Sequence, residues 1–558
     1  MYTPDNTSFP ERQPQPFIHF VRTLRRILAI AVAPLALLAQ ATPTVPVQHP
    51  VYRDLDRVIG AGLVDVSLAG QRPFTRREIV RLIQEASQSP PRRPMSDAIR
   101  RVLDRLRVEF AQDLGSAQPE PAAPKRTHIY SRGLEFLTLE SPARPIPTDA
   151  TGSIDAEINP ILNGRGGMRY QRSTNVAIEA QVGLRLGGNF LVYAMPRVSA
   201  GPGSIDSIGA YADAKASVLT GITTWRNVRL EIGRQHVVWG QGFDGGLMLS
   251  ASGPPLDMVR VSSEAPFHAP WVFRRFGPLR ASAFIADLGS RQDIPHAKLF
   301  AYKLSAQILP WFELSPFVMG EQGGRGAPVA PFIDYVVDLI PPLKYSLRHK
   351  NRSQFSNKMA GGEGRIRVPS LHGLQIYGDV TLDDADPRRW RSTFVEDGGQ
   401  SFGISIQDLG PQGALSAATE YHHTGIRYFK HTVFSSGFAF NQTVLGDQLG
   451  NQGDGGYLRL RWDGGGRRAL TLDLASERRR GDQWGTTSTP PDEDDFRFVL
   501  QQSFPAEWRR RASLEWLTWG SGRRLALTVA FERVTNFEFV RDQTLNNLLI
   551  GASFHADR

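Results

Sequence analysis

A two-residue alternation of apolar and polar side chains runs from about Thr127 to the end of the sequence, with no comparable helical stretch to interrupt it. The clearest run covers residues 176–186 and ends at a Gly-Gly-Asn turn. The same pattern returns at 458–462, 470–474, 525–532 and 548–554. Because successive side chains of a strand point to opposite faces, the alternation predicts a long antiparallel β region.

The alternation also fits a half-buried sheet of a soluble sandwich, but three features favour a transmembrane barrel. The runs approach the ~9–11 residues that cross a bilayer at a tilt. The polar face carries Arg and Glu in mid-strand, which a wet lumen tolerates, and the apolar face ends in aromatics such as Trp462 and Phe554. A closed barrel also pairs every backbone group, as lipid requires. Residues 128–558, at roughly 22–27 residues per strand with its connection, give about 16–20 strands.

The N-terminal region is typical of a secretory signal. Three arginines at 22–26 precede the apolar run Ile27–Leu38, and an A-x-A cleavage site follows at 39–41. The apolar run spans only ~18 Å at helical rise, which is short of the ~30 Å hydrocarbon core, so a cleaved signal is favoured over a membrane anchor. Residues 1–20 are polar and unusual before a signal, so translation is expected to begin near Val21.

Three short helical patterns follow the signal. The first places apolar residues on one face at 51–59 and ends at a Gly-Ala-Gly sequence. The second begins with Thr75-Arg-Arg-Glu78, a capping box in which the two outer side chains are expected to satisfy exposed amide groups. The third begins at Ser96 and carries an apolar stripe as far as Phe110. So small a bundle is marginal alone, so we expect it to lean on something larger.

These patterns divide the chain. A Pro- and Ala-rich stretch at 115–125 is typical of a linker. The predicted parts are a signal region at 1–41, a helical bundle with its linker at 42–127, and a barrel at 128–558. Beyond the signal no stretch approaches eighteen uncharged apolar residues, so no transmembrane helix is predicted.

Composition excludes several classes of function. The chain has no cysteine, which removes disulfides, thiolate metal sites, Cys nucleophiles and a lipid-anchored N-terminal Cys. Lys and Arg number 65 against 55 Asp and Glu, a net charge of +10. The excess is diffuse over the β region, with no basic run interleaved with aromatics, so a nucleic-acid partner is not expected.

Several segments, in order, resemble the Wzi-type capsule-assembly proteins of the Gram-negative outer membrane. They are QHPVYRDLDRVIGAGLVD, RPFTRREIVRLI, EIGRQHVVWGQGFDGGLMLS, KMAGGEGRIRVP, LQIYGDVTLDD, TEYHHTG and HTVFSSGFAFNQTVLGDQLGNQGDGGYLRLRW. The resemblance implies an 18-stranded barrel, a periplasmic helical bundle at its inner mouth, and a lectin-like role in holding exported capsular polysaccharide. The C-terminus departs from the usual pattern, since four residues follow Phe554 where barrel proteins often end on the aromatic.

Motifs that suggest catalysis have simpler interpretations. Residues 240–245 match G-x-G-x-x-G, but a Gly-Pro-Pro break follows instead of the helix that a dinucleotide site needs, so we expect a glycine-rich loop inside the barrel. His236 near Ser250, and the pair His422-His423 beside Glu420, suggest a nucleophile or metal ligands. Adjacent strand positions face opposite ways, so histidines of the lumen or surface are the expected outcome.

Three acidic segments, 383–386, 447–454 and 492–495, carry enough oxygen ligands for Ca²⁺ but lack the spacing of a dedicated loop, so solvated loop charge is expected. Sugar binding calls for aromatic faces against pyranose rings and guanidinium groups against uronate carboxylates. Two clusters, each of which also suits an interfacial anchor on lipid phosphates, supply this combination. The candidate polysaccharide-binding residues are Arg388, Arg389, Trp390, Arg391, Trp508 and Arg510.

The sequence therefore predicts a mainly β protein: a monomeric outer-membrane barrel of about 18 strands with its helical bundle in the periplasm. It would be non-enzymatic, need no metal or cofactor, and hold an acidic or neutral surface polysaccharide. A channel for sugars or other small solutes is the alternative, and an outer-membrane hydrolase is weakened by the lack of a recognisable nucleophile motif. One conflict remains: counting strands back from a periplasmic C-terminus puts the long segment 479–495 on the periplasmic side, although long loops belong outside.

Overall fold

The structure is a computed structural model of the 558-residue chain. It describes residues 41–88, 95–115, 126–146, 156–186, 189–202, 210–331, 333–335, 355–383, 392–426, 428–429, 431, 433–486, 498–501, 505–520 and 522–557. Nearly all of the predicted signal, and all but the first residue of the predicted linker, lie outside these described residues.

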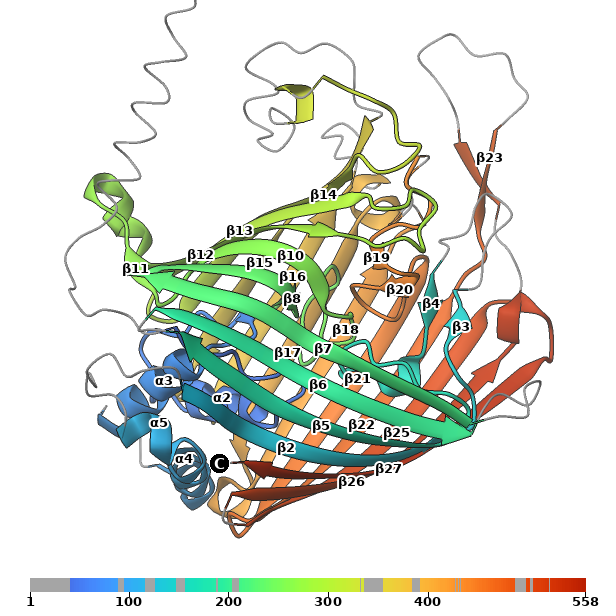
Figure 1. The fold of residues 1–558 in the computed structure, drawn as a ribbon. Helices are drawn as coiled ribbons and strands as arrows, with labels where there is room; N and C mark the ends of the chain where they lie inside the picture. Colours follow the sequence, from blue (N-terminus) through green and yellow to red (C-terminus); the bar gives the residue numbers. More distant parts are fainter. Residues whose placement is uncertain are drawn as a thin grey trace, which may run out of the picture.

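Eighteen antiparallel strands form a closed barrel, as predicted (Figure 1). The first wall strand pairs with the last, with Ser131 opposite Asp557 and Leu139 opposite Leu549, and this pairing closes the cylinder. The wall strands are β2 (Arg126–Leu139), β5 (Ser173–Leu186), β6 (Phe190–Pro202), β7 (Ala210–Trp225), β8 (Val228–Gln235), β10 (Leu256–Ser263), β12 (Pro278–Asp287), β13 (Lys298–Leu309), β14 (Phe312–Gln322), β15 (Ser356–Val368), β16 (Leu374–Leu382), β17 (Gly399–Leu409), β18 (Leu415–Thr424), β21 (Gly453–Gly464), β22 (Arg468–Arg479), β25 (Glu507–Gly520), β26 (Arg523–Thr535) and β27 (Thr544–Asp557).

The barrel wall has an apolar outer face and a polar inner face. Ile178, Val529 and Ile550 are each at least half exposed on the outside, whereas Glu532 and Asn547 are fully buried inside. In water so much exposed aliphatic surface would be unfavourable, but in lipid it is the expected arrangement. The alternation predicted from the sequence thus separates a lipid face from a lumen face.

The two ends of the barrel differ. At one end, here the head end, neighbouring strands are joined by short turns, such as the turn between β25 and β26. At the other, the loop end, the long connections 323–355, 425–452 and 480–506 are found. The sequence-based strand count failed at 480–506 because β23 (Gln483–Thr486) and β24 (Phe498–Gln501) pair only with each other and not with the wall. The long segment therefore lies at the loop end.

The helical head (residues 42–115) packs at the head end of the barrel, beside the C-terminus (Figure 1). Ser96 caps its third helix by accepting a hydrogen bond from the backbone N–H of Ile99, as predicted. Thr75 accepts from the N–H of Glu78, but the carboxylate of Glu78 pairs with Arg81 and Arg280, so only half of the predicted capping box forms. No described helix is both long and apolar enough to cross a membrane. The helices are α2 (Val51–Gly60), α3 (Arg76–Gln88), α4 (Asp97–Glu109) and α5 (Ala111–Gly115).

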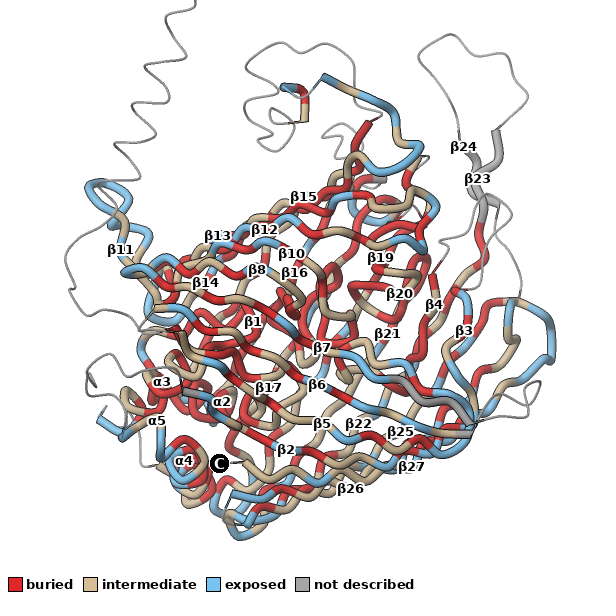
Figure 2. The backbone as a smooth tube through the Cα atoms, viewed as in Figure 1, coloured by how far each residue is buried: buried red, intermediate tan, exposed pale blue. Residues whose placement is uncertain are grey.

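Loops from the loop end fold into the lumen and build an apolar core there. This inner plug consists of residues 156–170, 236–255 and 428–452 and packs against inward side chains of the wall such as Phe284 and Met319. Buried backbone therefore fills the interior of the cylinder (Figure 2). The short elements of the plug, the head and the barrel rims are β1 (Gln71–Arg72, in the head), β9 (Val238–Trp239), β3 (Arg144–Pro145), β4 (Glu157–Ile158), β19 (Ala439–Phe440), β20 (Thr443–Val444), β11 (Phe267–His268), η1 (Pro160–Leu162), η2 (Trp271–Phe276), η4 (Ser392–Glu396), η5 (Pro411–Gly413) and η6 (Phe537–Phe539).

Candidate functional site

Buried ion pairs join the head to the inside of the barrel. The carboxylate of Asp463 on β21 accepts hydrogen bonds from Arg57 of α2, from Arg105 of α4 at 3.4 Å and from its strand neighbour Arg461 at 3.2 Å. Asp54 of α2 accepts from Arg105 at 2.6 Å and from Arg461 at 2.7 Å. All five side chains are at least nine-tenths buried. Because an unpaired buried charge costs several kcal/mol, these contacts fix the head in the barrel mouth.

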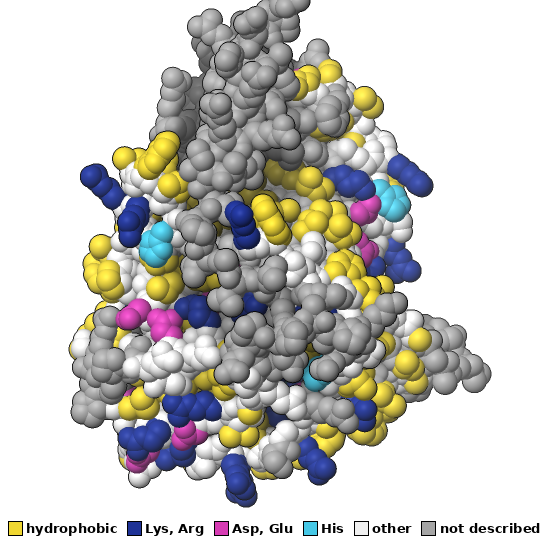
Figure 3. Space-filling view, turned by 60° about the vertical axis from the view of Figure 1, so that its left-hand side comes forward, with side chains coloured by type: hydrophobic (Ala, Val, Ile, Leu, Met, Phe, Trp, Pro, Cys, Tyr) yellow, Lys and Arg dark blue, Asp and Glu magenta, His cyan; other side chains and the backbone are white. Residues whose placement is uncertain are grey.

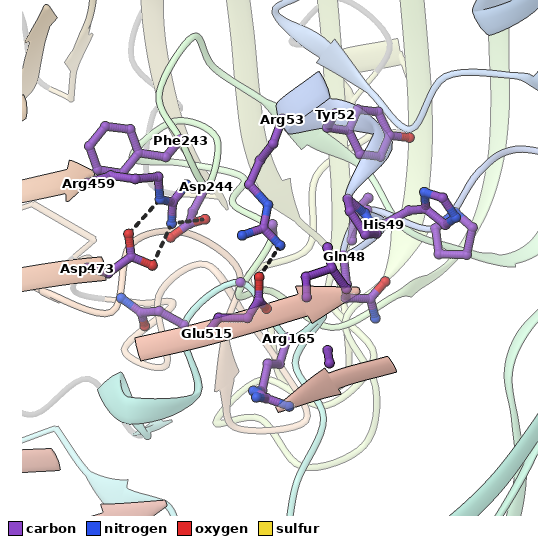
Figure 4. Close-up of a pocket in the computed structure, with 18 of the residues that line it drawn as sticks. Gln48, His49, Tyr52, Arg53, Arg165, Phe243, Asp244, Arg459, Asp473 and Glu515 are labelled. Atoms are coloured by element: carbon purple, nitrogen blue, oxygen red, sulfur yellow. Dashed lines mark hydrogen bonds and ion pairs between the residues drawn. The ribbon is translucent and has the colours of Figure 1, made fainter. Parts of the chain in front are cut away.

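A polar chamber of about 340 Å³ lies between the head and the inner plug (Figure 4). Head residues form one side of it, the plug loops at 161–170 and 241–251 form another, and the inner wall completes it. A volume near 300 Å³ is at the lower end of the range for small-molecule sites. The labelled side chains of Figure 4 that line it are Gln48, His49, Tyr52, Arg53, Arg165, Phe243, Asp244, Arg459, Asp473 and Glu515.

The charged side chains of this chamber are arranged as pairs. Arg459 of β21 donates to Asp473 of β22 at 2.6 Å, and its guanidinium lies 4.6 Å from the centre of the Phe243 ring. Arg53 of the head pairs with Glu515 of β25 at 2.6 Å. Since these cations are already neutralised by carboxylates, the chamber offers polar and aromatic surface rather than an open anion site.

A buried histidine and two carboxylates fasten the inner plug to the wall. His422 of β18 lies 2.5 Å from Asp447 through Nδ1 and 3.1 Å from Glu420 through Nε2. Glu420 also accepts from the Tyr377 hydroxyl at 2.8 Å and from the backbone N–H of Phe243 at 2.8 Å. One wall strand therefore holds both the 236–255 and the 428–452 loops. His422 is a lumen residue, as predicted, and its contacts are structural.

The glycine-rich segment 240–245 is a loop inside the barrel, as expected from the missing helix. Its Gly240 donates to the carbonyl of Gly70 at 3.1 Å, and β9 pairs with β1 of the head, so this loop joins plug and head. His236 and Ser250 have separate partners: His236 contacts the carbonyl of Gly166, and Ser250 donates to that of Gly446. Burial lowers the pKa of His236 to about 4, so its imidazole is neutral at pH 7.

The acidic segments do not form a described cation site. Asp454 contacts Tyr421 at 2.9 Å and His423 at 2.8 Å, and Asp447 pairs with His422. Residues 384–386 and 492–495 lie outside the described part of the chain.

A different trio, His49, Glu109 and Asp557, brings its ligand atoms within 4.8 Å of one another. The geometry favours hydrogen bonding over metal binding there. His49 Nδ1 accepts from the N–H of Val51, so the proton lies on Nε2, which faces Glu109 at 3.1 Å, and Asp557 pairs with Arg524 at 3.0 Å.

The predicted sugar-binding residues fall into two groups. Arg388, Arg389, Trp390 and Arg391 lie outside the described residues. Trp508 and Arg510 lie on the outer face of β25 near the loop end, where Trp508 is 38% exposed and the Arg478 guanidinium lies 5.9 Å from its ring centre. Their strand neighbour Arg509 points inward and is fully buried against Glu507.

The chamber itself was missed by the sequence analysis, because its walls come from segments hundreds of residues apart. Glu135 of β2, for example, binds Arg197 of β6 at 2.5 Å and accepts from the Tyr170 hydroxyl at 3.0 Å. The sequence did offer one signal for the chamber: charged residues at the inward positions of the alternating runs. This signal identifies side chains that face the lumen but not the side chains with which they pair.

A closed barrel with a lipid face, a helical head in one mouth and loops folded into its lumen defines a plugged transmembrane barrel. The family model of capsule assembly protein Wzi matches residues 151–549, and the chain belongs to that family. No curated protein matches the chain.

Among solved structures, the chain is similar to Wzi of Escherichia coli, described as an outer-membrane, carbohydrate-binding β-barrel involved in group 1 capsule assembly. The two share 16% identity over 93% of this chain and 100% of that one, with a TM-score of 0.63, so the comparison supports the shared fold. OccK5 of Pseudomonas aeruginosa gives 8% identity over 78% of this chain and 98% of that one, with a TM-score of only 0.41.

Proposed function

We propose that this protein lies in the outer membrane, with its head in the periplasm, and holds exported capsular or related surface polysaccharide at its loop end. The observation that carries the proposal is the filled lumen: within the described residues, the head occupies one mouth and the apolar core of the inner plug lies behind it. A channel for sugars needs a continuous wet path, and an apolar core in the lumen opposes one. Membership of the capsule-assembly family agrees with retention.

Retention would depend on many weak contacts along a repeating polymer, so that avidity compensates for low affinity at each site. Trp508 offers an exposed aromatic face at the loop end, and the exposed Arg510 next along that face can meet sugar carboxylates. We assign the same role to Arg388, Arg389, Trp390 and Arg391. The protein would act by binding and would need no metal or cofactor.

A polysaccharide-retention assay on the detergent-purified chain tests this function. We expect Trp390→Ala, Arg389→Ala and Trp508→Ala each to weaken retention, because each removes a stacking or ionic contact. Trp225→Ala is the matched control, since that side chain is 62% exposed on the barrel but at the head end. Equal polysaccharide retention by all variants would contradict the proposed binding sites. No retention by the unmodified chain would contradict the proposed function.

Conductance in planar bilayers separates retention from transport. A filled lumen predicts little or no steady conductance for the intact protein. A large steady conductance that falls when sugars are added would instead identify a sugar channel.

A further inference from the structure

The short helix η2 exposes four large apolar side chains at the head end of the barrel. Trp271 is 80% exposed, Val272 66%, Phe273 54% and Phe276 48%. None of the six residues of η2 is buried, and Phe273 stacks with Phe276 at 6.3 Å between ring centres. Contiguous exposed apolar side chains on a folded protein mark an interaction surface.

The wall holds η2 in place. Gly277 follows the helix with φ of +70°, and a Cβ there would lie 2.1 Å from the carbonyl oxygen of Gln307 on β13. Gly277 also donates its N–H to the carbonyl of Arg274 at 3.2 Å, which closes the last turn of the helix. Only glycine fits so closely against the wall strand. Helix η2 therefore packs against the wall at its C-terminal end and projects from the rim beside β11 (Figure 1).

The surroundings of η2 are those of a membrane interface. Trp225 ends strand β7 and Trp311 lies in the turn between β13 and β14, both at the head end beside η2, at 62% and 48% exposure. Val261 and Leu309, on wall strands next to η2, continue the outer apolar face. Tryptophan concentrates at the level of lipid headgroups, so η2 extends an interfacial girdle.

Basic charge accompanies the apolar side chains. Arg274 and Arg275 are exposed within η2, and no described carboxylate forms an ion pair with either. Figure 3 brings this side of the molecule forward and shows basic side chains among apolar ones. Paired aromatic and arginine side chains at a bilayer surface favour anionic lipid over neutral lipid.

We propose that η2 is a membrane anchor, which inserts Trp271, Val272, Phe273 and Phe276 into the leaflet at the head end and binds anionic phospholipid phosphates through Arg274 and Arg275. The inference rests on the proposed position of the barrel in a membrane. Lipid is the occupant that the site favours, because η2 is continuous with the lipid face and carries two arginines that form no ion pair among the described residues and match phosphate in charge.

Because the chain has no cysteine, single-cysteine labelling tests the anchor directly. Phe273→Cys would carry an environment-sensitive fluorophore in the full chain, reconstituted in nanodiscs of phosphatidylcholine with or without phosphatidylglycerol. Val108→Cys on α4 is the aqueous control at 67% exposure, and Ile550→Cys on the wall is the lipid control at 51%. We expect the label at 273 to shift to the blue, to resist iodide and to be quenched by brominated lipid, as at 550.

The two arginines have their own test. Phosphatidylglycerol should increase the quenching of the label at 273 by brominated lipid. The double substitution Arg274→Ser and Arg275→Ser in the same labelled chain should remove that increase. A label at 273 that iodide quenches as strongly as at 108, while 550 stays protected, would overturn the anchor. If iodide also quenched the label at 550, the proposed position of the barrel in a membrane would itself be contradicted.

Discussion

At the residue scale, a few buried charges decide whether the head stays in the barrel. Asp463 serves three arginines, two of which belong to the head. All three guanidinium groups are buried away from water. Arg105 and Arg461 also pair with Asp54, whereas Arg57 also donates to the backbone carbonyls of Gln407 and Gly413.

We expect Asp463→Ala to weaken docking of the head by about 3–5 kcal/mol, since removing one partner of a buried ion pair leaves uncompensated charge. Limited proteolysis, followed by detection of head fragments, measures the effect. Asp97→Ala is the control, because its pair with Arg100 is about half exposed and such pairs contribute about 0.5 kcal/mol or less. Equal protease resistance in both variants would contradict this role of Asp463.

Acid should loosen the head through Glu78. Burial would raise the pKa of this carboxyl, but Arg280 on the wall and Arg81 on the helix together lower it below its ordinary value of 4.5. A lowered pKa in the folded state means that the charged form stabilises docking above pH 4.5, and that this contribution is lost as the pH falls below it. Pepsin digestion at stepped pH should therefore release the head more readily under acid, and Glu78→Gln should show a weaker pH dependence than the unmodified chain.

Residue-level prediction from sequence reached the orientation of side chains but not their partners. Arg459 and Arg461 were correctly placed on the polar face of β21 by alternation alone. The contact from Arg461 to Asp54 spans 407 positions, and no local periodicity encodes so distant a pairing. Trp508 and Arg510 were proposed together and do share one face, which alternation at spacing two requires.

At the scale of elements, the two faces of each wall strand face different solvents. On β26, Val529 is 51% exposed outside, whereas its neighbour Thr528 lines the chamber. One strand therefore offers a matched comparison at almost the same depth.

We expect Val529→Arg to reduce the folded barrel, because an arginine on the lipid face costs about 2–4 kcal/mol near the bilayer midplane. Thr528→Arg is the control, since its side chain would enter a polar chamber. The folded fraction can be followed by the faster migration of unheated barrel on denaturing gels. A greater loss in Thr528→Arg than in Val529→Arg would contradict the assignment of the two faces.

Long periodic elements were predictable, and short ones were not. Helices α2 and α4 could be predicted from their apolar stripes, and α4 also from its Ser96 cap. The two-residue strands β1 and β9 exist only because head and plug meet, so neither has a period of its own. The apolar pattern of β24 resembles a wall strand, but it pairs with β23, and pairing is a tertiary choice.

At the scale of the whole molecule, the backbones of two loops of the inner plug pack closely against each other. A Cβ at Gly446 would lie 2.0 Å from the carbonyl oxygen of Leu247. Around this contact, the backbone N–H of Asp447 donates to the carbonyl of Leu247, and the backbone N–H of Ser250 donates to the carbonyl of Leu445, each at 3.0 Å. The plug is thus joined across loops that arise about 200 residues apart.

Gly446→Val should separate these loops and open the lumen, because backbone cannot yield as a flexible side chain can. We expect higher conductance in planar bilayers than for the unmodified protein. Gly456→Val is the control, since a Cβ at that wall position meets nothing within 4 Å. Unchanged conductance in Gly446→Val, in a variant that keeps the folded gel mobility, would show that this contact does not seal the lumen.

The pairing of β2 with β27 also sets an order of events during biogenesis. The first wall strand waits for a partner that is synthesised and exported last, some 400 residues later. Until then the growing sheet keeps two unpaired edges and an apolar outer surface, both of which invite aggregation in water. The topology therefore requires factors that shield the nascent strands. It also requires a site at which the whole chain enters the lipid as one unit.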